Sequence, residues 1–172
     1  MKARAATVAD ASAMADIYNA GIADRIATFE TRSRTADDIH SWFDDRHPIV
    51  VVEEPGAVIA FAATSTYRPR DCYAGIAEFS VYVARHARGR GAGRKAMEAL
   101  LAAAEAAGYW KLVSRVFIDN AASRRLLANL GFREVGIYER HAQLDGVWRD
   151  VVIVERLLGH GGEVTTSRSV RV

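Results

Sequence analysis

A short segment rich in glycine and arginine carries the clearest chemistry in this chain. Residues 88–94 read Arg-Gly-Arg-Gly-Ala-Gly-Arg and open an alanine-rich stretch that ends at Ala107. Glycines in alternate positions let backbone N–H groups point into one concavity, and a helix beginning there adds the positive end of its dipole. We predict that this glycine segment binds phosphate, with Arg88, Arg90 and Arg94 adding positive charge. The alternative is a mobile basic turn, which fits poorly between an apolar strand and a regular helix.

Glu78 is the second residue with clear chemical potential. It lies in an alternating strand with Phe79, Val81 and Val83, so its carboxylate is expected on or beside a largely apolar sheet. Lost hydration there favours the neutral acid and makes the carboxylate a stronger base. We predict that Glu78 deprotonates an ammonium substrate. The alternative is a structural ion pair with an arginine.

Two other phosphate-binding motifs compete with this interpretation of the glycine segment. A P-loop is excluded because Gly93 is followed by Arg-Lys-Ala and not by Gly-Lys-Ser or Gly-Lys-Thr. A dinucleotide fingerprint fits residues 91–96 loosely, with Asp119 beyond the next strand. That fingerprint normally turns directly out of the first strand of a repeated βαβ array, whereas residues 84–87 and a long mixed region come first here.

Composition narrows the class of protein. The 172 residues are 50% hydrophobic and carry a net charge of +2, which predicts one globular domain without the broad basic surface of a nucleic-acid-binding protein. No run approaches the roughly twenty apolar residues of a membrane helix, and the start lacks the apolar core of a signal peptide, so we expect a cytoplasmic protein. The single cysteine, Cys72, is expected to be a plain loop residue. The five histidines lack metal-ligand spacing, and no metal is predicted.

Periodicity and turn residues predict the elements that position these groups. The expected strands cover residues 2–6, 49–53, 58–66, 74–83, 112–117, 134–143 and 147–157. The first expected helix begins at Asp10 and ends near Gly21, and the second begins at Thr35 and stops before Pro48. The third begins at the glycine segment and ends near Gly108, and the fourth begins at Asn120 and ends near Gly131. This order predicts an α+β fold with a mixed sheet and one βαβ crossover. Residues 1–158 form the expected domain, and residues 159–172 the expected flexible tail.

The order and the spacing Arg88-x-x-Gly91-x-Gly93 resemble the GCN5-related N-acetyltransferases, which bind acetyl-coenzyme A. The resemblance covers residues 2–158 and implies their fold, a mixed, mostly antiparallel sheet flanked by helices. Asn120-x-x-Ser123 followed by Gly131-Phe132 resembles the second signature of the family. Four further segments resemble the phosphinothricin and arsinothricin N-acetyltransferase subgroup, namely residues 28–30, 67–70, 77–83 and 145–151.

The resemblance implies roles for named residues. Pantetheine would bond the backbone of Val81, Tyr82 and Val83, and the pyrophosphate and its surroundings would contact Arg88, Gly89, Arg90, Gly91, Ala92, Gly93, Arg94, Asn120 and Ser123. A valine at Gly91 is expected to obstruct the N–H groups and abolish cofactor binding. The acceptor would be held by Phe29, Arg68, Arg70 and Tyr73, with Tyr67 and Trp148 as further walls. The subgroup commonly has histidines where this chain has Asp145 and Arg149, which argues against histidine-assisted proton transfer there.

These inferences predict an acetyl-coenzyme A dependent N-acetyltransferase. It would acetylate the α-amine of a glutamate-like toxic amino acid, namely arsinothricin or phosphinothricin, with methionine sulfoximine as a further candidate. Glu78 would act as base through water, N–H groups near Val81 would stabilise the oxyanion, and Tyr138 is a candidate proton donor to the thiolate. The subgroup implies a homodimer. The alternatives are acetylation of another small amine or a protein N-terminus, and a coenzyme A binding module without catalysis.

Overall fold

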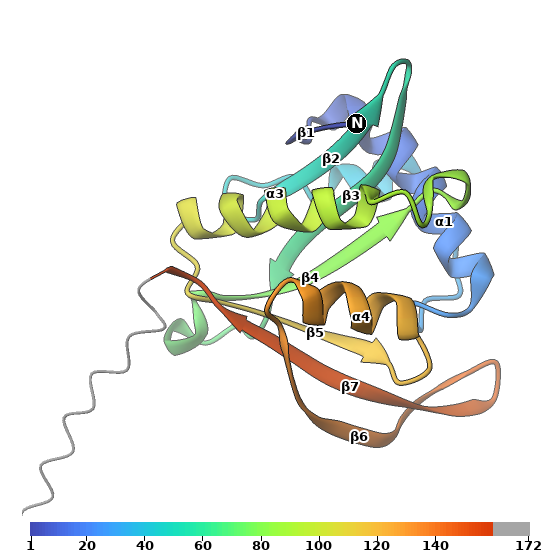
Figure 1. Cartoon of the computed structure of the whole chain (residues 1–172), viewed down its shortest axis with the longest axis vertical. Helices are drawn as coiled ribbons and strands as arrows, with labels where there is room; N and C mark the ends of the chain where they lie inside the picture. The colour runs from blue at the N-terminus through green and yellow to red at the C-terminus, as the bar shows by residue number, and fades with distance from the viewer. Residues whose placement is uncertain (160–172) are drawn as a thin grey trace, which may run out of the picture.

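The computed structural model describes residues 1–159 and shows a single twisted sheet with helices on both faces (Figure 1). Seven strands lie in the order β1-β2-β3-β4-β5-β7-β6. The strands are β1 (Lys2–Ala5), β2 (Ile49–Glu54), β3 (Ala57–Thr66), β4 (Ile76–Val83), β5 (Lys111–Phe117), β6 (Arg133–Leu144) and β7 (Val147–Leu157). The helices are α1 (Ala11–Asp24), α2 (Ala36–His40), α3 (Ala92–Ala106) and α4 (Ala121–Asn129). The expected tail, except for Gly159, lies outside the described residues.

Only β4 and β5 run parallel, and every other neighbouring pair in the sheet is antiparallel. Helix α3 connects β4 to β5, as a parallel connection requires. The mixed, mostly antiparallel sheet with one crossover is therefore confirmed, and so is the predicted order of helices and strands. Among the described residues no helix is long and apolar enough to cross a membrane.

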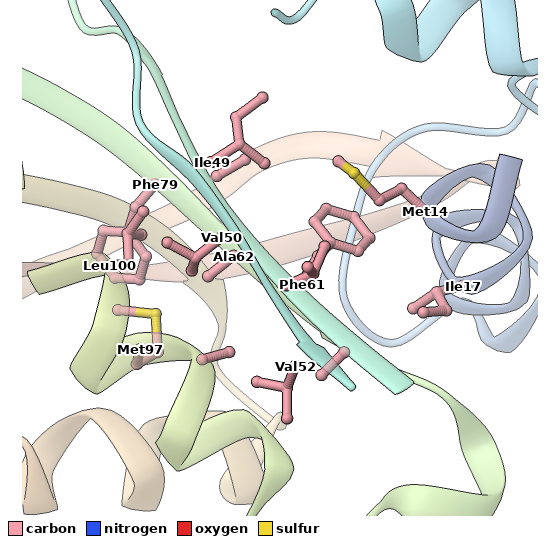
Figure 2. Packing of buried hydrophobic residues seen from close by; sticks show 14 of the residues in the cluster. Met14, Ile17, Ile49, Val50, Val52, Phe61, Ala62, Phe79, Met97 and Leu100 are labelled. Atoms are coloured by element: carbon pink, nitrogen blue, oxygen red, sulfur yellow. The ribbon is translucent and has the colours of Figure 1, made fainter. Parts of the chain in front are cut away.

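The centre of the core is the pair β2–β3, covered on both faces. Met14 and Ile17 of α1 pack on one face of this pair, and Met97 and Leu100 of α3 pack on the other (Figure 2). Phe61 of β3 is fully buried on the α1 face, where its ring stacks with that of Tyr82 (Figure 2). A strand buried on both faces reads as a continuous apolar run, which explains the sequence of β2 and β3.

Helix α1 is longer than predicted, because Gly21 does not end it. The helix continues to Asp24 and stops at Arg25, whose φ of 58° is left-handed. Gly21 lies inside the helix, where an added Cβ would lie 2.8 Å from Cδ1 of Tyr82. The glycine therefore permits close packing of α1 on β4. Asp10 stands at the N-cap position, but its carboxylate accepts from Arg4 at 2.8 Å and from the Thr7 N–H at 2.8 Å, leaving the helix uncapped by a side chain.

The start of α2 follows the sequence prediction, but the helix ends earlier than predicted, at His40. Thr35 and Asp38 form a reciprocal capping box at the start of α2, with the Asp38 N–H donating to Thr35 Oγ1 at 3.2 Å. Helix α2 is only one turn long, and Trp42 and Phe43 pack against the core from beyond its end. The tip of the β6–β7 hairpin is Asp145-Gly146, where φ is positive at both residues, as a two-residue hairpin turn of type I′ requires.

Candidate active site

Strands β4 and β5 separate shortly after they begin to pair. Their parallel register covers three residue pairs and ends at Glu78 opposite Val113. Beyond this point β4 stays paired with β3, and β5 stays paired with β7. The Ser114 hydroxyl donates to the Phe79 carbonyl oxygen at 2.9 Å, which bridges the two strands where they part. The sheet consequently contains a V-shaped gap between two firmly held edges.

A cavity of about 820 Å³ fills this gap and is lined from both sides of the sheet. Residues of α4 such as Ser123 and Leu126 line it on the face that α3 covers, and Gly21 and Phe29 line it on the face that α1 covers. Alternation along β4 separates the strand's side chains in the same way. Val83 packs against Gly93 of α3, whereas Tyr82 packs against Gly21 of α1. Two molecules could thus approach the gap from opposite faces.

The open edge of β4 offers backbone groups to the cavity. In an antiparallel strand, the N–H and C=O of one residue point to the same side, and neighbouring residues alternate. The carbonyls of Phe79 and Val83 accept bonds from Ser114 and Arg88 on the gap side. Val81 stands between them with the same orientation, so its N–H and C=O also face the gap. This edge is a preformed row of hydrogen-bonding groups.

The glycine segment turns directly into α3 at one end of the cavity. Gly89 and Gly91 have φ values of 73° and 87°, which only glycine adopts without strain. The first bond within α3 runs from the Lys95 N–H to the Gly91 carbonyl at 3.0 Å. The three preceding N–H groups, of residues 92–94, therefore have no partner within the helix. Such a helix start with free N–H groups is suited to an anion.

The structure adds a conformational reason for glycine at position 91. An added Cβ at Gly91 would meet no protein atom within 4 Å, so packing within the protein does not require the glycine. The constraint is the left-handed φ, which a β-branched residue adopts only under strain. At Gly93 packing within the protein does favour glycine, because a Cβ would lie 3.2 Å from Val83 Cγ2 and 3.4 Å from Leu126 Cδ2.

The arginines of the glycine segment are less available than predicted, because each has an acidic partner. Arg88 pairs with Asp24 at 2.6 Å, and Arg90 pairs with Glu54 at 2.7 Å. Arg94 pairs with Glu98 at 2.8 Å. Arg90 also does not line the cavity. The anion-binding character of this end therefore comes mainly from backbone N–H groups and from the dipole of α3.

Asn120 connects the cavity wall to the loop after α1. Its side-chain oxygen accepts from the Ser123 N–H at 3.1 Å and caps α4, as predicted. Its amide nitrogen donates to the Ile26 carbonyl at 3.1 Å. Asn120 and Ser123 both line the cavity. One side chain thus fixes both a helix start and a neighbouring loop.

Glu78 lies at the point of the V, and it has an arginine partner. Nη2 of Arg115 donates to Glu78 Oε1 at 2.6 Å, and both residues line the cavity. The carboxylate belongs to the α1 face of β4, opposite to Phe79 and Val83. The expectation of a largely apolar surrounding is therefore wrong, because the side chain is 29% exposed and paired with a cation. Of the two interpretations offered for Glu78, the ion pair is present, and it does not exclude the catalytic one.

Aromatic and polar side chains complete the α1 face of the cavity. Phe29 packs edge-to-face on Phe117, with ring centroids 4.8 Å apart, and lies 6.4 Å from the His141 ring. Burial raises the pKa of Tyr82, so its hydroxyl stays protonated. His141 belongs to a bulge in β6, where the pairing with β7 shifts between Tyr138 and Ala142. Such bulges redirect side chains, and this one brings His141 to the cavity wall.

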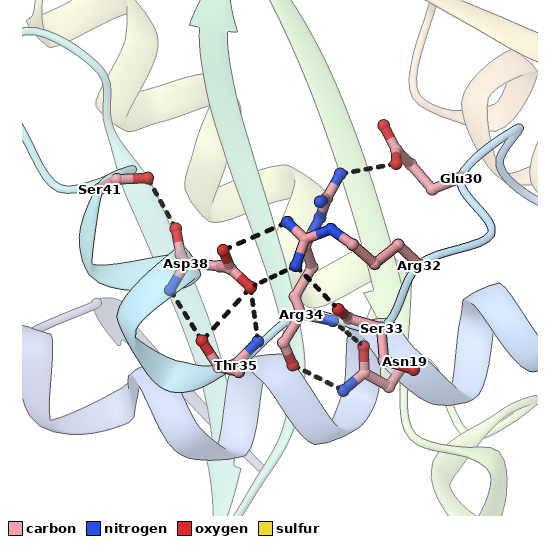
Figure 3. Close-up of polar contacts among 8 residues, drawn as sticks. All are labelled: Asn19, Glu30, Arg32, Ser33, Arg34, Thr35, Asp38 and Ser41. Carbon is pink, nitrogen blue, oxygen red and sulfur yellow. Dashed lines mark hydrogen bonds and ion pairs between the residues drawn. The ribbon is translucent and has the colours of Figure 1, made fainter.

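The loop between α1 and α2, residues 25–35, is held in place at both ends. At its far end Asn19 exchanges two hydrogen bonds with the Arg34 backbone, at 2.7 and 2.8 Å (Figure 3). Arg34 also pairs with Glu30 at 2.6 Å. At the near end Arg25 pairs with Asp145 at the tip of the β6–β7 hairpin. Phe29 and Glu30 are thus presented to the cavity on a fixed loop.

The loop over residues 67–73 lies apart from the cavity wall. Arg68 and Arg70 are exposed, and neither they nor Tyr73 line the cavity. Arg68 lies over the Tyr67 ring, and the Tyr67 ring packs against that of Tyr73. These contacts are all between side chains of the loop itself. The neighbouring Tyr67 raises the pKa of Arg68. Ser65, two residues before the loop, does line the cavity, so the loop begins beside the cavity wall.

The predicted cofactor residues apart from Arg90 do meet around the cavity, together with Glu78 and Phe29. Arg115, Ser114 and His141 also line the cavity, and none of them was predicted from the sequence. Arg115 interrupts the apolar run of β5, and that interruption was the available signal. Trp148 is exposed on the hairpin. Among the described residues no group of three acidic, histidine or cysteine side chains could hold a metal ion.

Comparison with known proteins places this arrangement in a family. The family model described as the acetyltransferase (GNAT) family matches residues 14–132. The chain is 33% identical to YwnH of Bacillus subtilis, over 92% of this chain and 99% of that protein. It is 31% identical to the L-methionine sulfoximine/L-methionine sulfone acetyltransferase of Salmonella typhimurium, over 90% and 93%. The fold matches that of the phosphinothricin acetyltransferase from Sinorhizobium meliloti in complex with AcCoA, with a TM-score of 0.87, 27% identity and coverage of 98% and 94%.

The fold and the divided sheet define an acetyltransferase. The chain belongs to the acetyltransferase (GNAT) family, and the resemblance inferred from the glycine segment and Asn120 is confirmed.

Proposed function

We propose that this protein transfers the acetyl group of acetyl-coenzyme A to the α-amine of an amino acid. The observation that carries the proposal is the gap in the sheet, which joins an anion-binding helix start and an open strand edge to a carboxylate on the opposite face. The relatives named above for amino-acid acetylation support this substrate class. The solved relative that holds AcCoA supports the cosubstrate.

The cosubstrate would enter on the face covered by α3 and α4. Its pyrophosphate would accept hydrogen bonds from the N–H groups of residues 89–94, and Arg88 and Asn120 lie beside them in the wall. The amide groups of its pantetheine arm would extend the sheet along the open edge of β4 at Val81 and Val83. This arrangement would bring the thioester to the point of the V, near the Val81 N–H and within the same cavity as Glu78.

The acceptor would approach on the α1 face, between Phe29 and the β6–β7 hairpin. Its free amine nitrogen would attack the thioester carbonyl carbon, forming the N–C bond of the amide while the C–S bond breaks. Glu78, through a water, would take the proton that the ammonium group loses. The Val81 N–H would stabilise the negative oxygen that develops on the carbonyl. The leaving thiolate would take a proton, and Tyr138 and the nearby His141 are the groups of the β6 bulge that could deliver one.

We further propose glutamate-like toxic amino acids as the acceptors, with phosphinothricin, arsinothricin and methionine sulfoximine as the compounds to test. Such acceptors carry a second polar or anionic group beyond the α-carboxylate. Arg68 and Arg70 belong to the loop that follows Ser65 of the cavity wall, and we propose that they interact with this distal group from the surface. Phe29 offers an apolar wall for the aliphatic stem between the two ends.

We propose that two copies of the chain associate through β6. This strand forms the outer edge of the sheet, and nearly all of its residues are exposed. Ile137 and Tyr138 of β6 and Val147 and Trp148 of β7 are each more than half exposed, which gathers apolar surface at this edge. An unpaired edge bearing apolar side chains is suited to pairing with another strand. Light scattering coupled to size exclusion measures the mass, and a strictly monomeric protein would contradict this proposal.

An acceptor screen tests the proposed function. Release of the coenzyme A thiol is followed with acetyl-coenzyme A and a panel that contains phosphinothricin, arsinothricin, methionine sulfoximine, methionine sulfone, simple amines and an N-terminal peptide. We expect turnover with one or more of the amino acids and little with the other acceptors. Preference for a peptide or a simple amine would overturn the substrate assignment, and the absence of any transfer would overturn the proposed activity.

A further inference from the structure

Among the described residues, Arg115 is the only arginine or lysine that lines the cavity on its acceptor side. Three arginines line the cavity, and Arg88 and Arg94 belong to the glycine segment. Arg115 stands on β5, just past the point where β4 and β5 separate. Phe117, two residues further along the same strand and therefore on the same face, contacts Phe29. Arg115 thus shares the α1 face with the acceptor wall.

Most of the hydrogen-bonding capacity of Arg115 is unused. Its guanidinium has five N–H donors, and within the described part of the chain its only polar partner is Glu78. The side chain of Arg115 is 48% exposed, and that of Glu78 is 29% exposed. Other arginines of the sheet, such as Arg4, which bonds Asp10 and Glu53, are more fully engaged. Arg115 therefore holds the carboxylate of Glu78 while it presents free donors to the cavity.

We propose that Arg115 binds the α-carboxylate of the acceptor amino acid while it remains paired with Glu78. One guanidinium would then hold two carboxylates side by side, that of the base and that of the substrate. Because the α-amine and the α-carboxylate are attached to the same carbon, this places the amine beside Glu78. The arrangement selects α-amino acids over amines without a carboxylate. This inference rests on the proposed amino-acid acetylation and names the group that recognises its substrate.

The geometry distinguishes this role from a purely structural one. A pair whose only task was to connect β4 and β5 would duplicate the backbone pairing at Glu78 and the Ser114 bond to Phe79 at the same place. A guanidinium in the cavity wall with unused N–H groups matches the planar, bidentate shape of a carboxylate. A purely structural arginine would influence all acceptors alike. A carboxylate-binding arginine would influence only those acceptors that carry one.

The test compares the best amino-acid acceptor with its α-carboxamide, which keeps the amine and the side chain but loses the negative charge. In the parent protein we expect a much lower KM for the amino acid than for the carboxamide. In Arg115→Gln the KM for the amino acid should rise about tenfold to hundredfold, the usual effect of losing a charge-assisted hydrogen bond. The KM for the carboxamide should hardly change. The preference between the two acceptors therefore collapses in the variant.

Two further variants complete the design. Arg115→Lys keeps the charge but not the planar fork, so it should recover only part of the preference. Arg4→Gln is the matched control, because Arg4 pairs with Glu53 across two strands of the same sheet and lies outside the cavity. That control should keep the parental preference.

The possible outcomes separate the inference from the proposed function. An unchanged ratio of the two KM values in Arg115→Gln, with kcat lowered for both acceptors alike, would show that Arg115 only positions Glu78 and would overturn the inference. In that case the proposed function stands. A parent protein that acetylates no amino acid would overturn the proposed function and the inference together. Thermal unfolding of Arg115→Gln is expected to match the parent, because the pair is partly exposed.

Discussion

The two sides of the cavity are constructed in different ways. The cofactor side is formed largely by backbone groups of one continuous stretch, from the open edge of β4 through the glycine segment to the start of α3. The acceptor side is formed by side chains that come from four separate segments, namely Phe29, Glu78, Arg115 and His141. A backbone site depends on conformation and tolerates changes of side chain. A side-chain site depends on each residue, and it can change its ligand through single substitutions.

The largest expected effect is on the acceptor side, at Glu78. Glu78→Gln keeps the shape of the side chain and removes its basicity, so kcat should fall about hundredfold or more, as is typical for a lost general base. Affinity for acetyl-coenzyme A, measured by calorimetry, should stay at the parental value. This result would show that a substitution can impair catalysis on the acceptor side without impairing cofactor binding.

The matched control for Glu78 is Glu53→Gln. Glu53 also pairs with an arginine, Arg4, but lies outside the cavity. Its variant should retain parental turnover. Full activity of Glu78→Gln, or a Glu78→Gln protein that no longer folds, would argue that Glu78 is a structural partner of Arg115.

On the cofactor side, we expect a change of backbone conformation to weaken binding. Gly91→Val forces a β-branched residue into a φ of 87°, and the loop relieves that strain of about 1–3 kcal/mol by moving its N–H groups. Affinity for acetyl-coenzyme A should therefore fall about tenfold or more in calorimetry. Gly108→Val is the matched control, because Gly108 has the same φ and open surroundings at the other end of α3. It should lose stability but bind the cofactor normally, and a comparable loss of binding in both variants would contradict the assignment.

The same contrast explains what the sequence could predict. The glycine segment and the Asn120 cap express their structure within a few neighbouring residues, so periodicity and capping rules locate them. The overall order of strands and helices was predictable for the same reason. The Glu78–Arg115 pair depends on a register between strands 37 residues apart in the chain, which no local pattern encodes. His141 reaches the cavity because of a bulge in β6, and bulges leave little trace in sequence.

The end of α1 shows the same limit on a smaller scale. Glycine commonly terminates helices, so Gly21 was predicted to end this one. In the structure Gly21 instead makes room for the Tyr82 ring, a tertiary contact between segments about 60 residues apart. Glycine thus has two roles in this fold, conformational freedom at Gly91 and close approach at Gly21. Only the first role has a local sequence signature.

Phe29 should give a smaller effect, because its contribution is shared with other walls. Phe29→Ala removes the edge-to-face contact with Phe117, and such pairs contribute about 0.5–1.5 kcal/mol beyond buried area. The KM for the acceptor should rise about threefold to tenfold, while the KM for acetyl-coenzyme A changes little. Phe29→Leu, which keeps apolar volume, should recover part of the loss. A rise confined to the KM for acetyl-coenzyme A would show that Phe29 belongs to the cofactor side of the cavity.

The smallest effect is expected at Arg70, and it tests how far the acceptor side extends. Arg70 is exposed and does not line the cavity, so its charge would act on a distal anionic group across solvent. Interactions between exposed charges contribute at most about 1 kcal/mol, which corresponds to a rise in acceptor KM of about fivefold or less in Arg70→Ala. The effect should shrink further in high salt. A hundredfold rise would instead mean that the loop over residues 67–73 closes onto the substrate, and the acceptor side would then include a fifth segment.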